Sequence, residues 1–370
     1  MSASKYLTPR GALFAIAVVA ALTTQLTVGS HPAAAAGAPP QPTQTDALAT
    51  EVDVALQAEL WTALREARQH SIAPGMSISV LAADGRQWSG ADGWHSNGAW
   101  INVGDPLTIG SVTKTFTAAT ILAMVDQGLI QLDAPTSTYL HNVALVKGTT
   151  VRQLLSHTSG IADLYGPAIG LLNGAPGAVL GSNAVLRPIG ESYFAPGTGY
   201  HYSNTNYYLL GLIIEGVSGR SVDEEFQARF TGPLGLAQTR LLGPADVQLP
   251  PAWSTAFWTS GAMVSTPTEL ARWGQALYGG SVISPAGLLR MLDFRSGSHY
   301  GEGAQLLPLG DRLVAGHSGL IYETTTLLVH LPEGITIALA ATAPNTDLEA
   351  ALVDSYGGPS LLELIHRLVA

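Results

Sequence analysis

Strand patterns lie at the two ends of this chain, and helical patterns fill the region between them. Near the start, apolar and polar residues alternate over residues 76–80, a strand with one buried face, and the Asp84-Gly85 turn leads into a returning strand over 87–94. Near the end, residues 322–331 and 335–342 are rich in β-forming side chains and are joined by a Pro-Glu-Gly turn. Hairpins at both ends predict an α+β fold in which one antiparallel sheet packs against helices.

The intervening sequence predicts an inserted, all-helical lobe. A helix is expected over residues 46–70, with Asp46 as its N-cap, and another closes the chain over 359–370. Helical spacing recurs between the hairpins, cut by loops rich in glycine and proline, over residues 112–127, 151–155 and 206–217. The chain is therefore expected to form an α/β part from residues 46–110 and 255–370, and an α lobe from residues 111–254. Ligand clefts favour such junctions.

Composition narrows the class of protein. Apolar residues make up 46% of the 370 and charged residues 12%, which is enough to bury a large core and excludes wholesale disorder. The net charge of −10 lacks the basic excess of a nucleic-acid binder, so no nucleic-acid partner is expected. The absence of cysteine excludes disulfides, thiolate catalysis and Cys-ligated zinc. Histidines without ligand spacing predict no metal site, and no cofactor is expected.

The first 36 residues have the pattern of a secretory signal. Lys5 and Arg10 precede a short apolar run over residues 12–22, and small residues follow up to Ala36, where cleavage is expected. The alternative is an uncleaved membrane anchor, which usually needs about twenty apolar residues. Residues 37–45 are expected to be a flexible leader. The mature protein is therefore predicted to work in the cell envelope or outside the cell, with no stable membrane span.

The first motif that carries chemistry is Ser111-Val112-Thr113-Lys114. It stands at the start of the predicted helix over residues 112–127, so the two polar side chains lie about one turn apart on the same side. A serine hydroxyl needs a neighbouring base to become a nucleophile, and a desolvated lysine with a lowered pKa can act as that base. The alternative is an ordinary N-cap serine followed by a solvated lysine.

Two further motifs follow along the chain. Tyr202-Ser203-Asn204 ends a turn-rich stretch, where a phenol can transfer a proton and an amide can hold a substrate. His317-Ser318-Gly319 precedes the predicted strand over residues 322–331, and its glycine lets a substrate backbone approach the strand edge. In isolation, each has a structural alternative: a packed aromatic residue before a helix cap, and a turn at the entry to a strand.

Ser-x-x-Lys, Tyr-x-Asn and His-x-Gly, in this order, resemble the motifs of the serine β-lactamase/penicillin-binding protein superfamily. The variation at the last two motifs is similar to secreted D-alanyl-D-alanine carboxypeptidases and class C β-lactamase-like serine hydrolases. Residues 154–161 and 260–266 also look like segments of this family, so the resemblance extends over about residues 50–345.

The resemblance implies a role for each motif residue. Ser111 would be the acylated nucleophile, while Lys114 and Tyr202 would move protons, with the primary base left open between them. Asn204 would hold a substrate amide. The last motif would bind the substrate from the strand: His317 and Ser318 would face its carboxylate, Gly319 would let it approach, and the backbone N–H of Leu320 would join that of Ser111 in an oxyanion hole.

The substrate class implied by the resemblance is a cell-wall peptide cleaved at its terminal D-alanine through an acyl-enzyme. Alternatives are an esterase or other amidase, a β-lactamase, and an inactive wall-sensing protein with the same fold. Histidine at position 317, in place of lysine, argues against an efficient β-lactamase, and Arg295 or Arg312 could supply charge for a carboxylate. His157 is expected to be structural rather than part of a Ser/His/Asp triad.

Overall fold

The structure is a computed structural model that describes residues 53–141, 143–146, 148–294 and 298–369. The chain divides into two compact units, residues 1–44 and 45–370, and all described residues lie in the second. The predicted signal, the leader, residues 46–52 of the first helix and Arg295 lie outside the described residues. Within the described ranges, every helix is too short or too polar to cross a membrane.

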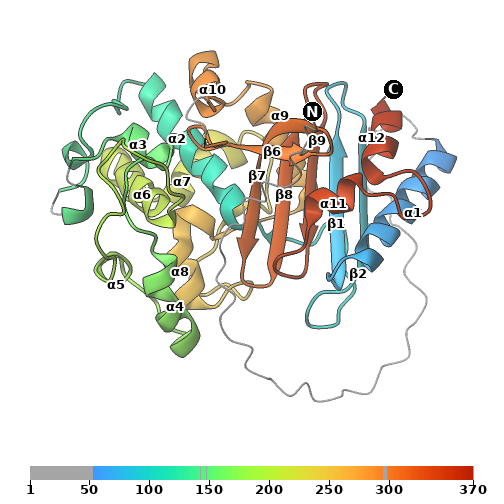
Figure 1. The fold of residues 1–370 in the computed structure, drawn as a ribbon, viewed down its shortest axis with the longest axis horizontal. Helices are drawn as coiled ribbons and strands as arrows, with labels where there is room; N and C mark the ends of the chain where they lie inside the picture. Colours follow the sequence, from blue (N-terminus) through green and yellow to red (C-terminus); the bar gives the residue numbers. More distant parts are fainter. Residues whose placement is uncertain (1–52, 142, 147, 295–297, 370) are drawn as a thin grey trace, which may run out of the picture. The chain divides into compact units, whose positions relative to one another are not determined.

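Within the described residues, a six-stranded antiparallel sheet forms the centre of the unit, in the order β2-β1-β9-β8-β7-β6 (Figure 1). Both predicted hairpins are confirmed, because β1 pairs with β2 and β8 pairs with β9. In addition, β1 pairs with β9, so the N-terminal and C-terminal hairpins belong to one sheet. A smaller sheet has the order β3-β5-β4. The strands are β1 Gly75–Leu81, β2 Gln87–Gly93, β3 Leu107–Thr108, β4 Arg240–Leu241, β5 Met263–Ser265, β6 Gln305–Leu309, β7 Arg312–Ile321, β8 Thr324–His330 and β9 Thr336–Ala341.

Helices flank the large sheet and build the α lobe, which confirms the predicted α+β class. The described helices are α1 Val54–His70, α2 Thr113–Asp126, α3 Val151–Leu155, α4 Tyr165–Gly174, α5 Ser182–Leu186, α6 Asn204–Ser218, α7 Val222–Phe226, α8 Pro251–Gly261, α9 Pro267–Tyr278, α10 Pro285–Met291, α11 Leu348–Val353 and α12 Leu361–Val369. The first helix begins at Val54 with Asp53 as its N-cap, not at Asp46 as the sequence suggested. The predicted lobe boundary at residue 254 falls inside α8.

The two faces of the large sheet are covered by different helices. On one face, the terminal helices α1, α11 and α12 form an apolar cluster with alternate side chains of β1, β8 and β9. On the other face lies α9, which packs on β1, β8 and β9. Ser77 and Ser79 of β1 are fully buried, so the expectation of a strand with one buried face is wrong. Apolar and polar residues do alternate along β1, but α9 excludes water from the face that carries the serines as well.

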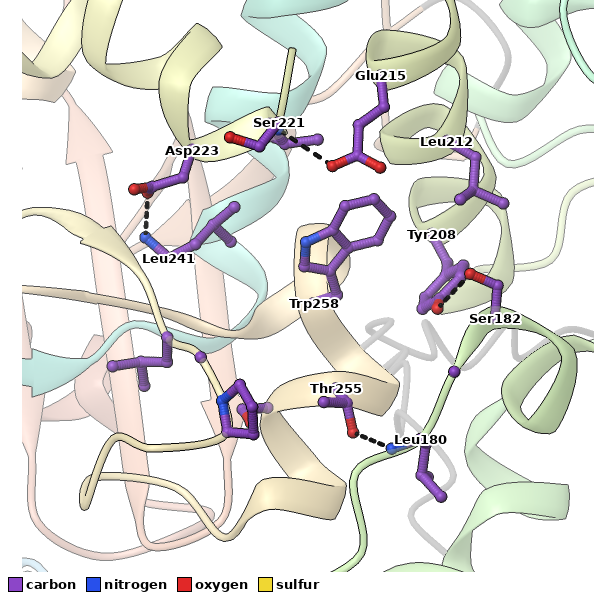
Figure 2. A pocket seen from close by; sticks show the side chains of 16 residues that line it. Leu180, Ser182, Tyr208, Leu212, Glu215, Ser221, Asp223, Leu241, Thr255 and Trp258 are labelled. Atoms are coloured by element: carbon purple, nitrogen blue, oxygen red, sulfur yellow. Dashed lines mark hydrogen bonds between the residues drawn. The ribbon is translucent and has the colours of Figure 1, made fainter. Parts of the chain in front are cut away.

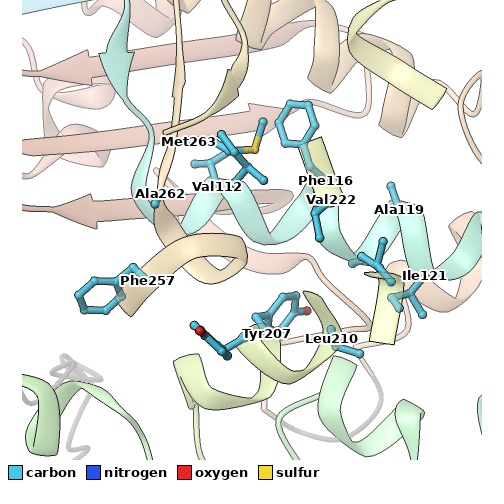
Figure 3. Close-up of a cluster of buried hydrophobic side chains, with 14 of the residues drawn as sticks. Val112, Phe116, Ala119, Ile121, Tyr207, Leu210, Val222, Phe257, Ala262 and Met263 are labelled. Carbon is cyan, nitrogen blue, oxygen red and sulfur yellow. The ribbon is translucent and has the colours of Figure 1, made fainter. Parts of the chain in front are cut away.

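The α lobe is built around α2, which is buried on nearly every side. Its apolar residues pack with α6, α7 and α8, as the cluster in Figure 3 shows. Phe116 stacks on Trp273 of α9 with ring centroids 3.9 Å apart, and the Trp273 indole N–H donates to Thr115 Oγ1 at 2.8 Å. A helix surrounded by protein must pair its polar side chains internally. These contacts hold the N-terminal end of α2 in one position.

The close approach of α9 to the sheet depends on Gly274. A β-carbon at this position would lie 2.7 Å from Leu328 Cδ1 and 2.8 Å from Thr336 Cγ2. We predict that Gly274→Ala lowers the free energy of unfolding by about 1–3 kcal/mol through overpacking. Gly170→Ala in α4, where a β-carbon meets open space, should instead be neutral or stabilise by about 0.4–1 kcal/mol. Denaturant unfolding of the two variants measures the difference, and equal effects would contradict this account.

Candidate active site

Ser111 lies in a tight turn where the large sheet meets the α lobe. A single 3₁₀ turn, Gly110–Val112, precedes α2, and Gly110 has a φ of +51°. A β-carbon on Gly110 would lie 2.6 Å from the backbone nitrogen of Leu320 in β7. Glycine is therefore required here, both for the backbone conformation and for the approach of β7.

Lys114 follows one turn later, and its side chain is completely buried. Its Nζ lies 2.9 Å from Ser111 Oγ, 2.8 Å from Asn204 Oδ1 at the start of α6, and 2.6 Å from the carbonyl oxygen of Ser260 in α8. The structure thus brings together Ser111, Lys114 and Asn204 from two separate motifs. Three acceptors around one amine are enough to satisfy it in its charged form.

Burial lowers the pKa of Lys114 to about 7, and the nearby Asp163 carboxylate opposes this shift. Near neutral pH the amine is therefore both charged and uncharged in similar proportion. An uncharged amine has two protons and one lone pair. With its protons donated to Asn204 and Ser260, its lone pair faces the Ser111 hydroxyl and can accept that proton.

Tyr202 lies beside the same hydroxyl. Its side chain hydrogen bonds with Ser111, and its ring centroid is 4.8 Å from Lys114 Nζ. Burial raises the pKa of Tyr202 well above its usual value, so the phenol keeps its proton at neutral pH. These opposite shifts favour Lys114 as the group that accepts a proton and Tyr202 as the group that donates one, a choice that the sequence left open.

The backbone nitrogens of Ser111 and Leu320, expected to form an oxyanion hole, both lie at the contact between Gly110 and Gly319. A β-carbon on Gly319 would lie 2.1 Å from the carbonyl oxygen of Ile109 and 3.3 Å from the nitrogen of Ser111. The absence of a side chain at Gly319 thus lets β7 contact the turn Gly110–Val112 that carries Ser111. The N–H of Ser318 donates to the Gln305 side chain of β6, and alternation along the strand directs the N–H of Leu320 to the same side of β7.

His317 does not occupy the place expected of it. Its side chain is fully buried, with Nε2 3.1 Å from the Tyr300 hydroxyl and Nδ1 2.6 Å from the carbonyl oxygen of Ser318. Burial, together with the charge of Lys114, lowers the pKa of His317 to about 3. It is therefore neutral near pH 7 and cannot present a cation to a substrate carboxylate. Arg312, the other candidate within the described ranges, pairs with Glu333.

Ser318 and Asn204 are held by protein partners that the sequence did not reveal. Both the N–H and the hydroxyl of Ser318 donate to Gln305 Oε1, at 2.7 and 2.9 Å. A substrate that is to bind Ser318 must therefore displace the Gln305 side chain. The amide of Asn204 bridges Lys114 and Asp163, so it orients the lysine in addition to any substrate contact.

The geometry can now be set beside known proteins. The family profile described as Beta-lactamase matches residues 62–355. The chain belongs to this beta-lactamase family. The resemblance to the serine β-lactamase/penicillin-binding protein superfamily, stated from the three motifs, is confirmed.

Relatives within the beta-lactamase family include several D-aminopeptidases. The D-aminopeptidase of Brucella anthropi is 29% identical over 291 residues, 71% of this chain and 54% of that protein. Penicillin-binding protein 4* of Bacillus subtilis is 32% identical over 36% of this chain and 30% of its own length. A D-stereospecific amidohydrolase from Streptomyces has a TM-score of 0.70 and 25% identity, covering 82% of this chain and 99% of the other. The chain spans about half the length of the D-aminopeptidase relatives.

Asp163 is the functional-site residue that sequence reasoning missed. Its Oδ1 accepts from the backbone N–H of Asn204 at 2.7 Å and its Oδ2 from the Asn204 amide at 3.3 Å, so its carboxylate lies at the N-terminus of α6. A helix N-terminus stabilises negative charge, but burial outweighs this and raises the pKa of Asp163 above its usual value. The one available signal was position, because Asp163 closely follows the family-like segment 154–161.

His157 is a structural residue in this beta-lactamase-family fold, as expected from the sequence. It is fully buried with a φ of +58°, and its Nδ1 accepts from the N–H of Ser203 at 3.1 Å and lies 3.2 Å from Asn206 Nδ2. Its ring packs against that of Tyr202 at 4.3 Å. Burial lowers the pKa of His157, so the neutral imidazole fixes the segment that carries Tyr202.

The buried amine of Lys114 should leave a signature in stability. Its pKa is about 7 in the folded protein and close to 10.5 when unfolded, so between these values the unfolded chain binds the extra proton. This site therefore favours folding increasingly as pH rises. We predict that the unfolding free energy of the wild type, relative to Lys114→Met, grows by about 1–2 kcal/mol from about pH 7.5 to about pH 9. A difference that is flat with pH would contradict a depressed pKa.

Asp163 should set the pH at which Lys114 becomes a base. Because its charge raises the pKa of Lys114, Asp163→Asn should move the acidic limb of the acylation rate to lower pH and also lower the maximal rate by about tenfold or more. Asp126→Asn, at the far end of the same α2 helix, removes an equal charge and should leave the limb in place. If Asp163→Asn lowered the acylation rate but left the pH of the acidic limb unchanged, Asp163 would act only through packing.

Proposed function

We propose that this serine hydrolase cleaves the amide bond made by the carboxyl group of a D-amino acid whose amine is free, through an acyl-enzyme. The observation that carries the proposal is the charge of the site. His317 is neutral and buried, Lys114 is occupied by three acceptors, and the Asp163 carboxylate lies behind Asn204. Such surroundings suit a substrate ammonium group better than a terminal carboxylate.

In the proposed acylation, Lys114, Ser111 and Tyr202 act in the order set by which of them can accept and which can donate a proton. Lys114 takes the proton of Ser111, whose oxygen attacks the amide carbonyl and forms a tetrahedral oxyanion held by the N–H groups of Ser111 and Leu320, worth about 3–4 kcal/mol per donor. Tyr202 gives its proton to the leaving nitrogen as the carbon–nitrogen bond breaks, and the proton on Lys114 then restores the phenol. Deacylation repeats these transfers in reverse with water in place of the amine.

The relatives support the D-amino acid part of this proposal. D-aminopeptidase is the name of the Brucella anthropi relative and of others from Gluconobacter oxydans and Cereibacter sphaeroides. The cleavage of terminal D-alanine from wall peptides, favoured from the sequence, uses the same acyl-enzyme chemistry. It requires recognition of a terminal carboxylate, for which the described part of the site offers no free cation next to Ser111.

The place of action belongs to the same proposal. The signal-like pattern of residues 1–36 supports export, so we place the mature protein in the cell envelope or outside the cell. Peptides and amides that contain D-residues are its substrates there.

A substrate panel tests the function. We predict that D-alanine p-nitroanilide is hydrolysed with a kcat/KM at least tenfold above those of the L-isomer and of N-acetylated D-Ala-D-Ala peptides. Ser111→Ala should abolish turnover, whereas Ser281→Ala on the surface should not. Mass measurement after incubation with a fluorescent penicillin should show one adduct that is lost in Ser111→Ala.

Each alternative has its own result in this panel. A preference for the acetylated D-Ala-D-Ala peptide would establish a carboxypeptidase and overturn the proposal, as would faster turnover of p-nitrophenyl esters or of the penicillin. The absence of both an adduct and turnover would favour an inactive wall-sensing protein.

A further inference from the structure

A cavity of about 430 Å³ lies in the α lobe, bounded by α6, α8 and the start of α7. Ser111, Lys114 and Tyr202 do not line it, so it is distinct from the catalytic residues. Figure 2 shows the indole of Trp258 at its centre, with Glu215 and Tyr208 of α6 beside it. This volume is in the range of small-ligand sites.

The chemistry of the cavity is that of a receptor for an organic cation. Glu215 is half-buried, and its carboxylate accepts one hydrogen bond, from the N–H of Val222 at 3.3 Å. No arginine or lysine of the described residues forms an ion pair with it. Burial raises the pKa of Glu215, and the hydrogen bond from the N–H of Val222 opposes this shift. The rings of Trp258 and Tyr208 meet edge to face at 5.2 Å, and an ammonium group between a carboxylate and an indole face gains from both.

Trp258 also carries a strained backbone. It has φ 29° and ψ −114° in the middle of α8, and the helix is kinked at this residue. A bulky residue in such a conformation is strained, and the conformation persists only where its surroundings enforce it. Strain of this kind is concentrated at functional sites and at switch regions, so it marks Trp258 as more than a packing residue.

The kink leads directly to the catalytic lysine. Two residues after Trp258, the carbonyl oxygen of Ser260 accepts the 2.6 Å hydrogen bond from Lys114 Nζ. Between them, the carbonyl oxygen of Thr259 accepts from Thr117 of α2 at 2.7 Å, and its hydroxyl donates to the Tyr207 carbonyl. A change in the Trp258 backbone is therefore expected to move the Ser260 carbonyl oxygen, which is two residues away and is one of the three acceptors that hold Lys114.

We propose that this α-lobe cavity binds a small primary amine with an apolar body, and that its occupancy is coupled through Trp258 and the Ser260 carbonyl to Lys114. The amine pairs with Glu215, and the apolar body packs on Trp258, Tyr208 and Leu212. The site is a second, regulatory one, whose ligand acts by favouring one of the backbone arrangements around the kink. The inference does not depend on which amide or ester the enzyme cleaves.

Direct binding tests the first half of the proposal. The probe is 2-phenylethylamine, titrated by calorimetry into full-length Ser111→Ala protein, and its neutral counterpart is 2-phenylethanol. We expect the amine to bind at least tenfold more tightly than the alcohol. Glu215→Gln and Trp258→Leu should each weaken amine binding at least tenfold, whereas Glu66→Gln on α1 should leave it unchanged. Equal binding to the Glu215→Gln protein would place the amine elsewhere and overturn the site, as would no binding to the parent protein.

Kinetics test the coupling. Saturating 2-phenylethylamine should change the rate of Ser111 acylation, or the pH of its acidic limb, at least threefold in the otherwise wild-type enzyme and not in Glu215→Gln. A changed rate that persists in Glu215→Gln would mean that the amine acts at the catalytic site, and an unchanged rate with proven binding would overturn the coupling. Circular dichroism and thermal unfolding of each variant show that it is folded, so that loss of binding is assigned to the cavity.

Discussion

Burial of the Lys114 amine is the interaction on which the rest of the site depends. A lysine that is wholly excluded from water costs stability unless it is paired or uncharged. Here three acceptors, from the turn before α2, from α6 and from α8, surround it and let it exist in both forms near neutral pH. In the proposed mechanism, the arrangement that destabilises the charged amine also makes it a base, so the proposed catalytic function costs stability.

The glycines at the junction of sheet and lobe hold Ser111, the group on which the amine would act, next to β7. Gly110 and Gly319 let β7 come within contact of the nucleophile turn, which brings the N–H groups of Ser111 and Leu320 to the same place. Behind this surface, His157 and Asp163 fix the segment that carries Tyr202 and Asn204. The groups proposed for catalysis are thus held in place by glycine contacts and hydrogen bonds, with Lys114 and Asp163 as the titratable groups beside them.

The elements that the sequence predicted well are those with strong local patterns. Both hairpins, the closing helix, α3 and α6 were found within a few residues of their predicted bounds, because period and turn residues determine them locally. Two of the errors have one cause. The buried serines of β1 depend on α9, which is distant in sequence, and His317 was expected to face a ligand because its neighbour Tyr300 could not be foreseen. The start of α1 is instead set locally by the Asp53 cap, which the sequence also offered but which was not predicted.

By itself, the sequence determined the fold class, the family and the three motifs that carry the chemistry, since order, spacing and residue type are properties of the chain. Only the tertiary structure decided which groups are charged, which are buried and which oxygen each N–H meets. The low pKa of Lys114, the neutrality of His317 and the position of Asp163 beside Asn204 all arise from contacts between residues far apart in sequence. The free energy of a charge depends on its surroundings in three dimensions, and no local pattern records those.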